Sequence, residues 1–325
     1  MPEMSGGEAV IQALRAEGVE TVFGIPGLHN LALYDAMLRL GAPRHILARH
    51  EQGAAFMADG YARASGRVGV CLATTGPGAL NTLTAVAESY ASSIPTLVIM
   101  SDIPSPLLGL KKGALHEIPD QIRLFEPVTA WSETSREVSA IPRAIHRAFR
   151  WLRTSRPRPI ALSIPTDLLA ERAECLIQQG EPGVRPPADP NLIAQAADLL
   201  RRAQRPAVLV GGGVIASEAS VEVQAVCERL QAPVITTIMG RGAIPDTSPL
   251  VIAVLQNKGN SLPVLHSADV ILAVGTRFAH RATQSRPVPL RFSPEQTLIH
   301  VDLDPAEVGK MYQPTLGIVG DAQQV

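Results

Sequence analysis

The sequence predicts an α/β protein with two doubly wound, Rossmann-like domains, each built on a parallel sheet. Short apolar runs of strand length alternate with longer runs of helical period through both halves of the chain, which is the pattern of a parallel sheet covered by helices. Glycine-rich turns follow several of the apolar runs, as expected where parallel strands end. The length of 325 residues suffices for about two domains, each with its own core.

The first half opens with a helix that a capping box predicts. Ser5 and Glu8 are spaced to bond each other's backbone amides, and an apolar stripe of helical period follows, so a helix is expected at Gly6–Ala16. Strands are then expected at Thr21–Phe23, His45–Ala48, Val68–Ala73, Thr96–Met100 and Ile160–Ile164. The helices expected between and after them are Leu31–Leu40, Glu51–Ala64, Leu80–Ser92 and Ile141–Arg153.

A stretch rich in proline and glycine separates the two halves. Proline lacks an amide donor and breaks any strand ladder, so residues 171–189 are expected to link a first domain, residues 1–170, to a second, residues 190–325. The second series of expected elements is a helix at Leu192–Arg202 and strands at Ala207–Val210, Val234–Ile238, Val270–Val274 and Leu298–Leu303.

The composition indicates an enzyme that acts on small molecules rather than a protein that binds nucleic acid or spans a membrane. The net charge is −1 and aromatic residues make up 4%, so no basic, aromatic-rich surface for nucleic acid is expected. No apolar run approaches the ~18 residues that span a bilayer, and no leader pattern opens the chain. Cys71, Cys175 and Cys227 lack metal-site spacing, which is typical of reduced thiols in the cytoplasm, and no metal site is predicted.

The most informative run is Arg49–Arg63, which places Glu51 between a short apolar strand and a helix of small residues. Ligands of open parallel sheets bind at the carboxyl ends of the strands, where a carboxylate held against apolar surface can exchange protons with a heterocycle. A second interpretation stays open, in which Glu51 only stabilises the positive end of the helix.

Two further turns follow strands in the same half. Phe23–Gly27 and Ala73–Asn81 both combine glycine and proline, which allow a close backbone approach to a flat ligand and fix the turn. Each turn alone is also ordinary turn chemistry. Together with Glu51, and in this order, the turns resemble the pyrimidine-binding domain of thiamine-diphosphate enzymes of the acetolactate synthase, benzoylformate decarboxylase and pyruvate oxidase group.

The resemblance extends to the second half, which is similar to the central domain of the same group. The segments that carry it are Arg205–Val214, Pro233–Pro245, Val274–Phe278 and His300–Pro305. The resemblance implies a transferase or lyase acting on a 2-oxo acid. It also implies that Glu51 bonds a ring nitrogen of the aminopyrimidine and thereby controls its tautomer. The residues implied to line the ring are Pro26, Gly27, Thr75, Pro77 and Asn81.

Substrate recognition departs from the family pattern. Acetolactate synthases usually carry Phe-Gln-Glu where this chain has Leu115, His116 and Glu117, and Thr-Lys-His where it has Thr129–Trp131. The paired histidines of pyruvate decarboxylase are also missing. His29 and His116 are therefore candidate substrate residues, each with the alternative of an inert loop histidine.

A second cofactor is a further implication. The central domain of acetolactate synthase holds FAD, and the matching positions here are Arg156, Gly212, Arg277 and Asp302. However, residues 255–259 replace the Met-His-Gly element usual in the family. A flavin or nucleotide site and a nucleotide-type fold that only packs both stay open.

The family's third domain, which binds magnesium and the cofactor's diphosphate through a Gly-Asp-Gly motif, has no match in these 325 residues. We therefore expect the isolated chain to be inactive unless another domain or partner subunit supplies that half of the site. A homo-oligomer, most simply a dimer, is expected because the family's site forms between two chains. A non-catalytic scaffold that kept the fold is the alternative, although the retained Glu51 favours the enzyme.

Overall fold

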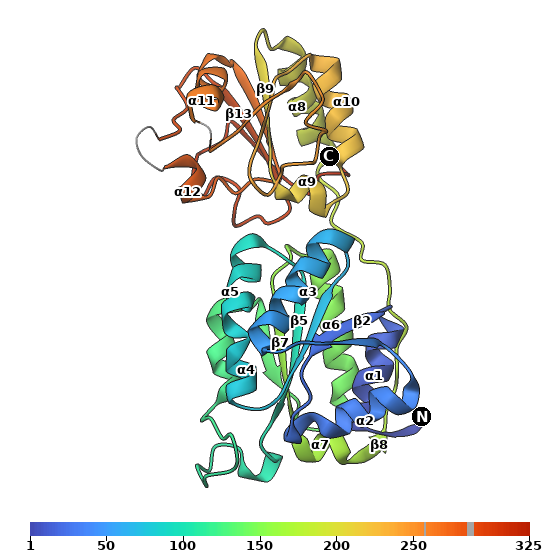
Figure 1. Cartoon of the computed structure of the whole chain (residues 1–325). Helices are drawn as coiled ribbons and strands as arrows, with labels where there is room; N and C mark the ends of the chain where they lie inside the picture. Colours follow the sequence, from blue (N-terminus) through green and yellow to red (C-terminus); the bar gives the residue numbers. More distant parts are fainter. Residues whose placement is uncertain (257, 285–288) are drawn as a thin grey trace. The chain divides into compact units, whose positions relative to one another are not determined.

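The computed structural model describes residues 1–256, 258–284 and 289–325. The chain divides into two compact units, Met1–Val184 and Arg185–Val325, and each contains a six-stranded sheet (Figure 1). All the strands of each six-stranded sheet pair in parallel. The predicted class, two parallel-sheet α/β domains, is confirmed.

The first unit has the strand order β3-β2-β4-β5-β7-β6. Its strands are β2 (Thr21–Gly24), β3 (Arg44–Leu47), β4 (Gly69–Ala73), β5 (Thr96–Asp102), β6 (Trp131–Thr134) and β7 (Ile160–Pro165). Its α-helices are α1 (Gly6–Ala16), α2 (Leu31–Leu40), α3 (Glu51–Ser65), α4 (Pro77–Asn81), α5 (Leu83–Ser92), α6 (Ala140–Thr154) and α7 (Thr166–Ala170). Three short 3-10 helices complete it, η1 (Leu28–Asn30), η2 (Ser105–Leu107) and η3 (Gln121–Val128).

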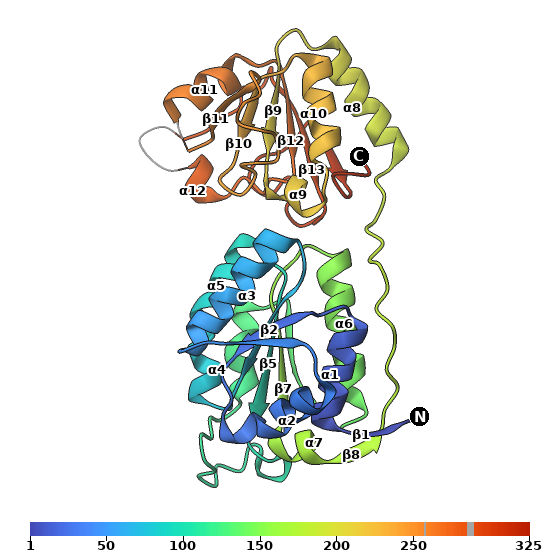
Figure 2. The ribbon, with the colours of Figure 1, turned by 45° about the vertical axis from the view of Figure 1, so that its right-hand side comes forward.

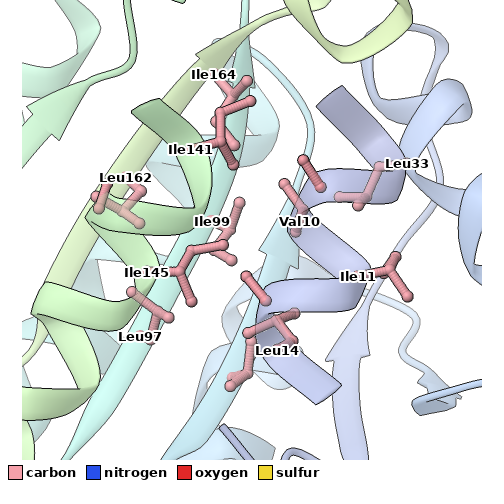
Figure 3. Packing of buried hydrophobic residues seen from close by; sticks show 14 of the residues in the cluster. Val10, Ile11, Leu14, Leu33, Leu97, Ile99, Ile141, Ile145, Leu162 and Ile164 are labelled. Atoms are coloured by element: carbon pink, nitrogen blue, oxygen red, sulfur yellow. The ribbon is translucent and has the colours of Figure 1, made fainter. Parts of the chain in front are cut away.

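Helices cover both faces of this sheet, with α1 and α6 on one side and α3, α4 and α5 on the other (Figure 2). Successive strand residues point to opposite faces, so Leu97 and Ile99 of β5 belong to the first core and Val98 and Met100 to the second. Figure 3 shows side chains of α1 and α6 meeting over β5 and β7. Burial on both faces explains why β5 reads as an unbroken apolar run until its end.

The second unit repeats the arrangement with the order β11-β10-β9-β12-β13-β14. Its strands are β9 (Pro206–Val210), β10 (Val234–Thr236), β11 (Val251–Val254), β12 (Val270–Val274), β13 (Thr297–Asp302) and β14 (Leu316–Val319). Its helices are α8 (Pro190–Arg202), α9 (Gly212–Ala216), α10 (Ser220–Leu230), α11 (Lys258–Ser267) and α12 (His280–Thr283). The core packs α8 and α10 on one face and α11 and α12 on the other.

Local signals in the first unit act as predicted, with one extension. Ser5 Oγ accepts from the Glu8 amide at 3.2 Å and Glu8 Oε2 accepts from the Ser5 amide at 2.7 Å, which is the capping box of α1. The single helix expected at Leu80–Ser92 begins earlier, at Pro77, because proline fits the first turn of α4, and it is divided at Thr82 into α4 and α5.

Much of the stretch expected to be a linker forms strand pairing, hydrogen bonds or ion pairs with the unit to which it belongs. β8 (Arg172–Glu174) pairs antiparallel with β1 (Glu3–Ser5). The Gly180 amide bonds the carbonyl of Ala16 at 3.0 Å, and Arg185 forms an ion pair with Asp321 at 2.9 Å. The division between the units, after Val184, falls inside the range expected for a linker.

Candidate functional site

The candidate site of the first unit gathers where neighbouring parallel strands end. Glu51 is the first residue of α3, shortly after β3 ends at Leu47. The Gly24–Gly27 turn follows β2, the inner neighbour of β3, and the Thr74–Pro77 turn follows β4, which lies on the other side of β2. The three segments chosen from the sequence therefore meet at one edge of the sheet.

Glu51 is held by a side chain from another helix. Asn81 Nδ2, at the end of α4, donates to Glu51 Oε2 at 2.8 Å. Among the residues that the structure describes, this is the only hydrogen bond of the Glu51 carboxylate, and Oε1 is not enclosed. One carboxylate oxygen is thus fixed, and the other can accept a bond from a ligand.

Two glycines pack closely against Thr74 beside this carboxylate. A Cβ atom on Gly78 would lie 3.2 Å from Glu51 Oε1 and 2.5 Å from Cγ2 of Thr74. A Cβ atom on Gly27 would lie 2.7 Å from the Thr74 side chain. Gly27 and Gly78 therefore approach Thr74 from two turns, and a side chain at either position would collide with it; we call this pair of glycines beside Glu51 the glycine cradle.

The buried side chains of Gln121 and Ser101 hold the turn after β4 in place. Gly76 adopts φ +63°, in the left-handed region, and its amide donates to Gln121 Oε1 at 2.5 Å. Gln121 Nε2 donates to the Ser101 carbonyl at 3.0 Å. Thr75 is fully buried, and its hydroxyl contacts Ser101 Oγ at 3.0 Å, so its side chain supports the turn from inside.

The other proposed ring contacts lie at the surface of these turns. Pro26 and Pro77 are exposed, and Gly27 donates its amide to Asn30 Oδ1 at 2.7 Å, which fixes the start of η1. Gln121, Ser101 and Asn30 were not expected from the sequence, because a buried amide or hydroxyl that supports a distant turn leaves no local pattern.

Near Glu51, burial disfavours the charged forms of the Cys71 thiol and the Tyr34 hydroxyl. Burial, with a smaller contribution from the charge of Glu51, raises the pKa of the Cys71 thiol to about 12. Burial also raises the pKa of Tyr34, with smaller contributions from Cys71 and Glu51. Cys71 and Tyr34 therefore stay neutral.

The two candidate substrate histidines lie next to each other. The rings of His29, in η1, and His116, in the loop after β5, have centroids 5.9 Å apart and meet edge to face at 79°. His116 also borders the Gly76 turn, since a Cβ atom on Gly76 would lie 2.2 Å from the His116 carbonyl oxygen.

The proposed flavin residues are distributed over both units. In the first unit, Arg156 Nε donates to Ser93 Oγ at 3.0 Å. In the second, Gly212 begins the short helix α9, Arg277 follows β12 and Asp302 ends β13. Asn257, part of the segment that replaces Met-His-Gly, lies outside the described residues.

The glycines near Gly212 have a packing role of their own. A Cβ atom on Gly211 would lie 2.0 Å from the Gly275 carbonyl oxygen, and the Gly213 amide bonds that same oxygen at 3.0 Å. These contacts join the ends of β9 and β12. They favour the interpretation in which this glycine run serves packing.

Within residues 1–256, 258–284 and 289–325, no group of three His, Cys, Asp or Glu side chains is placed to hold a metal ion. In the same ranges, no helix has the length and apolar character needed to cross a bilayer.

The fold and the site define a class of protein, and comparison with known families agrees. The model of the thiamine pyrophosphate enzyme N-terminal TPP-binding domain matches residues 4–124, and the model of the central domain of the same enzymes matches residues 193–325. The chain belongs to the thiamine pyrophosphate enzyme family and carries its N-terminal, cofactor-binding domain and its central domain.

Several individual proteins of known name are similar to this chain over nearly its whole length. A probable acetolactate synthase large subunit of Methanocaldococcus jannaschii is 40% identical over 99% of this chain and 55% of its own length. A probable 2-ketoarginine decarboxylase of Pseudomonas aeruginosa is 41% identical over 99% of this chain and 56% of its own length. An acetolactate synthase of Arthrospira platensis is 38% identical over 99% of this chain and 57% of its own length. The chain thus spans little more than half the length of these relatives.

Proposed function

We propose that this chain supplies the aminopyrimidine side of a thiamine-diphosphate site in an enzyme that acts on a 2-oxo acid. The observation that carries the proposal is Glu51, with Oε2 fixed by Asn81 and Oε1 open beside Gly78. A carboxylate that only stabilised a helix end would not require a side chain from another helix or a glycine cradle. These residues fit a flat, nitrogen-containing ring.

Thiamine diphosphate, when bound, supplies an electron sink for breaking or forming the carbon–carbon bond next to a carbonyl. The chain's own residues bind and orient it. Glu51 Oε1 holds a proton against a ring nitrogen, and Asn81 keeps the carboxylate in place. Gly27 and Pro26 bring the backbone close to the ring, and Pro77 borders it from the facing turn, while Thr75 supports that turn from inside.

The relatives' names support the proposed substrate class. One is named for acetolactate synthesis and another for decarboxylation of 2-ketoarginine, and a 2-oxo acid is common to the proposal and to the second name. We leave the product open, since the loop at Leu115–Glu117 differs from the acetolactate synthase pattern.

Magnesium and the cofactor's diphosphate are proposed to be held by a further domain or partner subunit, as in the family. Without it, we expect these 325 residues to bind the cofactor weakly and to show no turnover. FAD at Arg156, Gly212, Arg277 and Asp302 remains the second cofactor hypothesis, and the glycine packing of the second unit favours a fold without it.

A dimer through α3 is also proposed. Gly53, Phe56, Met57 and Gly60 follow helical spacing on one side of α3, and Phe56 and Met57 are 40% and 43% exposed. A Cβ atom on either glycine would meet no atom within 4 Å. An apolar, open stripe on the helix that carries Glu51 suits a second copy of the chain.

The proposed location is the cytoplasm. Cys71, Cys175 and Cys227 are all free and buried, which suits a reducing compartment.

The test compares two helix-start glutamates. Glu222 lies in the first turn of α10 and is exposed, so E222Q controls for the helix-end interpretation of Glu51. Ligand-observed NMR with thiamine and thiamine diphosphate should detect binding to the wild-type chain and to E222Q, and a loss of about tenfold or more in E51Q.

Turnover provides the second measurement, in protein completed with its magnesium-diphosphate domain. E51Q should lower the rate by about 10²–10⁴-fold, because an amide cannot exchange the proton. Equal binding and turnover in E51Q and wild type would contradict the enzyme and favour the scaffold.

A further inference from the structure

The backbone of His116 lies in the left-handed region, which few residues other than glycine adopt. Its φ is 60°, which is unfavourable for a residue with a Cβ atom. The next residue secures the loop, because Glu117 Oε2 accepts from the amides of Gly113 at 2.6 Å and Ala114 at 3.0 Å. Strain of this kind persists where surrounding contacts enforce it, and it concentrates at functional sites.

His29 has one nitrogen that the described part of the protein leaves unsatisfied. Its Nδ1 is buried without a hydrogen-bond partner, whereas Nε2 is not enclosed in this way. The backbone carbonyl of His29 accepts from Thr166 Oγ1 at 2.9 Å, which fixes the residue. A buried nitrogen without a partner is costly, so this imidazole is not explained by packing alone.

Asp102 is a buried carboxylate that interacts electrostatically with His29. Asp102, at the end of β5, accepts from Ser163 Oγ at 2.8 Å and from the Ile103 amide at 2.9 Å. Burial lowers the pKa of His29, and the charge of His116 lowers it further, while Asp102 opposes both. Burial raises the pKa of Asp102, and the hydrogen bonds from Ser163 and Ile103 and the charges of His29 and Arg136 oppose that rise.

The pair belongs to the same edge of the sheet as Glu51. His29 follows Gly27, a wall of the proposed ring pocket, and His116 covers Gly76 of the turn that leads to Gly78 and Asn81. The two imidazoles therefore lie along the proposed pocket, beyond the turns that face the ring.

We propose that His29 and His116 form the acid–base pair that faces the 2-oxo acid, in which His29 exchanges a proton through Nε2 and His116 lies edge to face beside it. This inference rests on the proposed function and adds to it a proton donor other than Glu51.

The proton balance of decarboxylation requires such a donor. When the bond between the carboxylate and the carbonyl carbon breaks, carbon dioxide leaves and the electron pair stays on the former carbonyl carbon. That carbon needs one proton before an aldehyde can depart. Protonated His29 donates it from Nε2, and water then reprotonates the imidazole, so no oxidant or reductant is needed.

The first experiment measures the pair without turnover. In the chain labelled at its histidines, NMR titration should show H116Q raising the pKa of His29, because a like charge is removed, and D102N lowering it, because an anion is removed. H280Q, an exposed histidine of the second unit, is the matched control. A His29 pKa unmoved by both H116Q and D102N would overturn the proposal.

The second experiment uses protein completed with the magnesium-diphosphate domain and pyruvate as the probe. H29Q should lower kcat at least tenfold and remove one ionisation from the pH profile of kcat, with the affinity for thiamine diphosphate unchanged. H280Q should match wild type. An H29Q protein with the wild-type kcat and pH profile would overturn the proposal.

The two hypotheses fail in different ways. If the completed wild-type protein shows no turnover dependent on thiamine diphosphate, the proposed function falls and the proton-exchange role of His29 falls with it. If E51Q removes turnover but H29Q does not, the proposed function stands and only the histidine pair is rejected.

Discussion

Asn81 donates a hydrogen bond of 2.8 Å to Glu51, so the last residue of α4 orients the first residue of α3. Removing the amide in N81A should lower the affinity for thiamine diphosphate by about 1.5–3 kcal/mol, the range for a hydrogen bond to a charged group. N81D should lower the affinity for thiamine diphosphate further than N81A, because it places a second carboxylate next to Glu51. Calorimetric titration measures both, with exposed Asn191 as the N191A control; equal affinities for N81A and N81D would contradict the geometry.

Gly78 should tolerate no side chain while the cofactor binds. In G78A the new methyl would lie 2.5 Å from Thr74 Cγ2 and 3.2 Å from Glu51 Oε1, so overpacking should cost about 1–3 kcal/mol of stability. The second change T74S removes Cγ2, and G78A/T74S should regain stability in urea denaturation. Its cofactor affinity should stay low, because the methyl still crowds Glu51; recovery of both would show that the cradle is unnecessary.

Asp102 should make stability depend on pH. Burial raises its pKa in the folded protein above the unfolded value of 3.8. Its stabilising contribution is therefore present below the unfolded pKa and is lost as pH rises through the folded pKa. D102N cannot ionise, so its Tm should exceed that of wild type at pH 7, with the excess shrinking toward pH 4. Calorimetric scans between pH 4 and pH 7 measure the difference in Tm between D102N and wild type. A difference that grows as the pH falls would contradict the prediction.

The exposed stripe of α3 should control assembly. F56E places a charge on the surface proposed to meet a second copy, whereas V221E changes a residue of α10 that is 76% exposed. Sedimentation velocity should show a dimer for wild type and V221E and a monomer for F56E. Identical behaviour of the two variants would place the interface elsewhere.

Much of the first unit could be predicted because its signals are local. Central strands such as β5 are buried throughout, so their apolar runs are continuous, and Ser5 with Glu8 marks the start of α1. Glu51 could be chosen because it follows a strand directly and precedes a helix of small residues. A short stretch of chain holds all of this information.

Three of the four edge strands, β6, β11 and β14, were not predicted, whereas the edge strand β3 was expected at His45–Ala48. β6 is only partly buried and reads Trp-Ser-Glu-Thr, and β14 contains a glycine between apolar residues, so neither shows a clear period. Edge strands gain their conformation from the neighbour with which they pair.

The contact between His29 and His116 also had no local signal. The two residues come from different loops, and only the order β2-β4-β5 brings those loops to one edge. Sequence placed Thr75 at the ring, while the structure turns its hydroxyl inward to Ser101. The direction of a side chain in a tight turn depends on tertiary partners such as Gln121.

The attachment of residues 172–188 limits how the polypeptide can be divided for separate expression. Ending the first half at residue 170 would remove β8, the partner of β1, together with the contact of Gly180 with Ala16. Starting the second half at residue 190 would discard Arg185, the partner of Asp321. A break beside Val184 keeps β8 with β1 in one half and Arg185 with Asp321 in the other, so both halves retain these contacts.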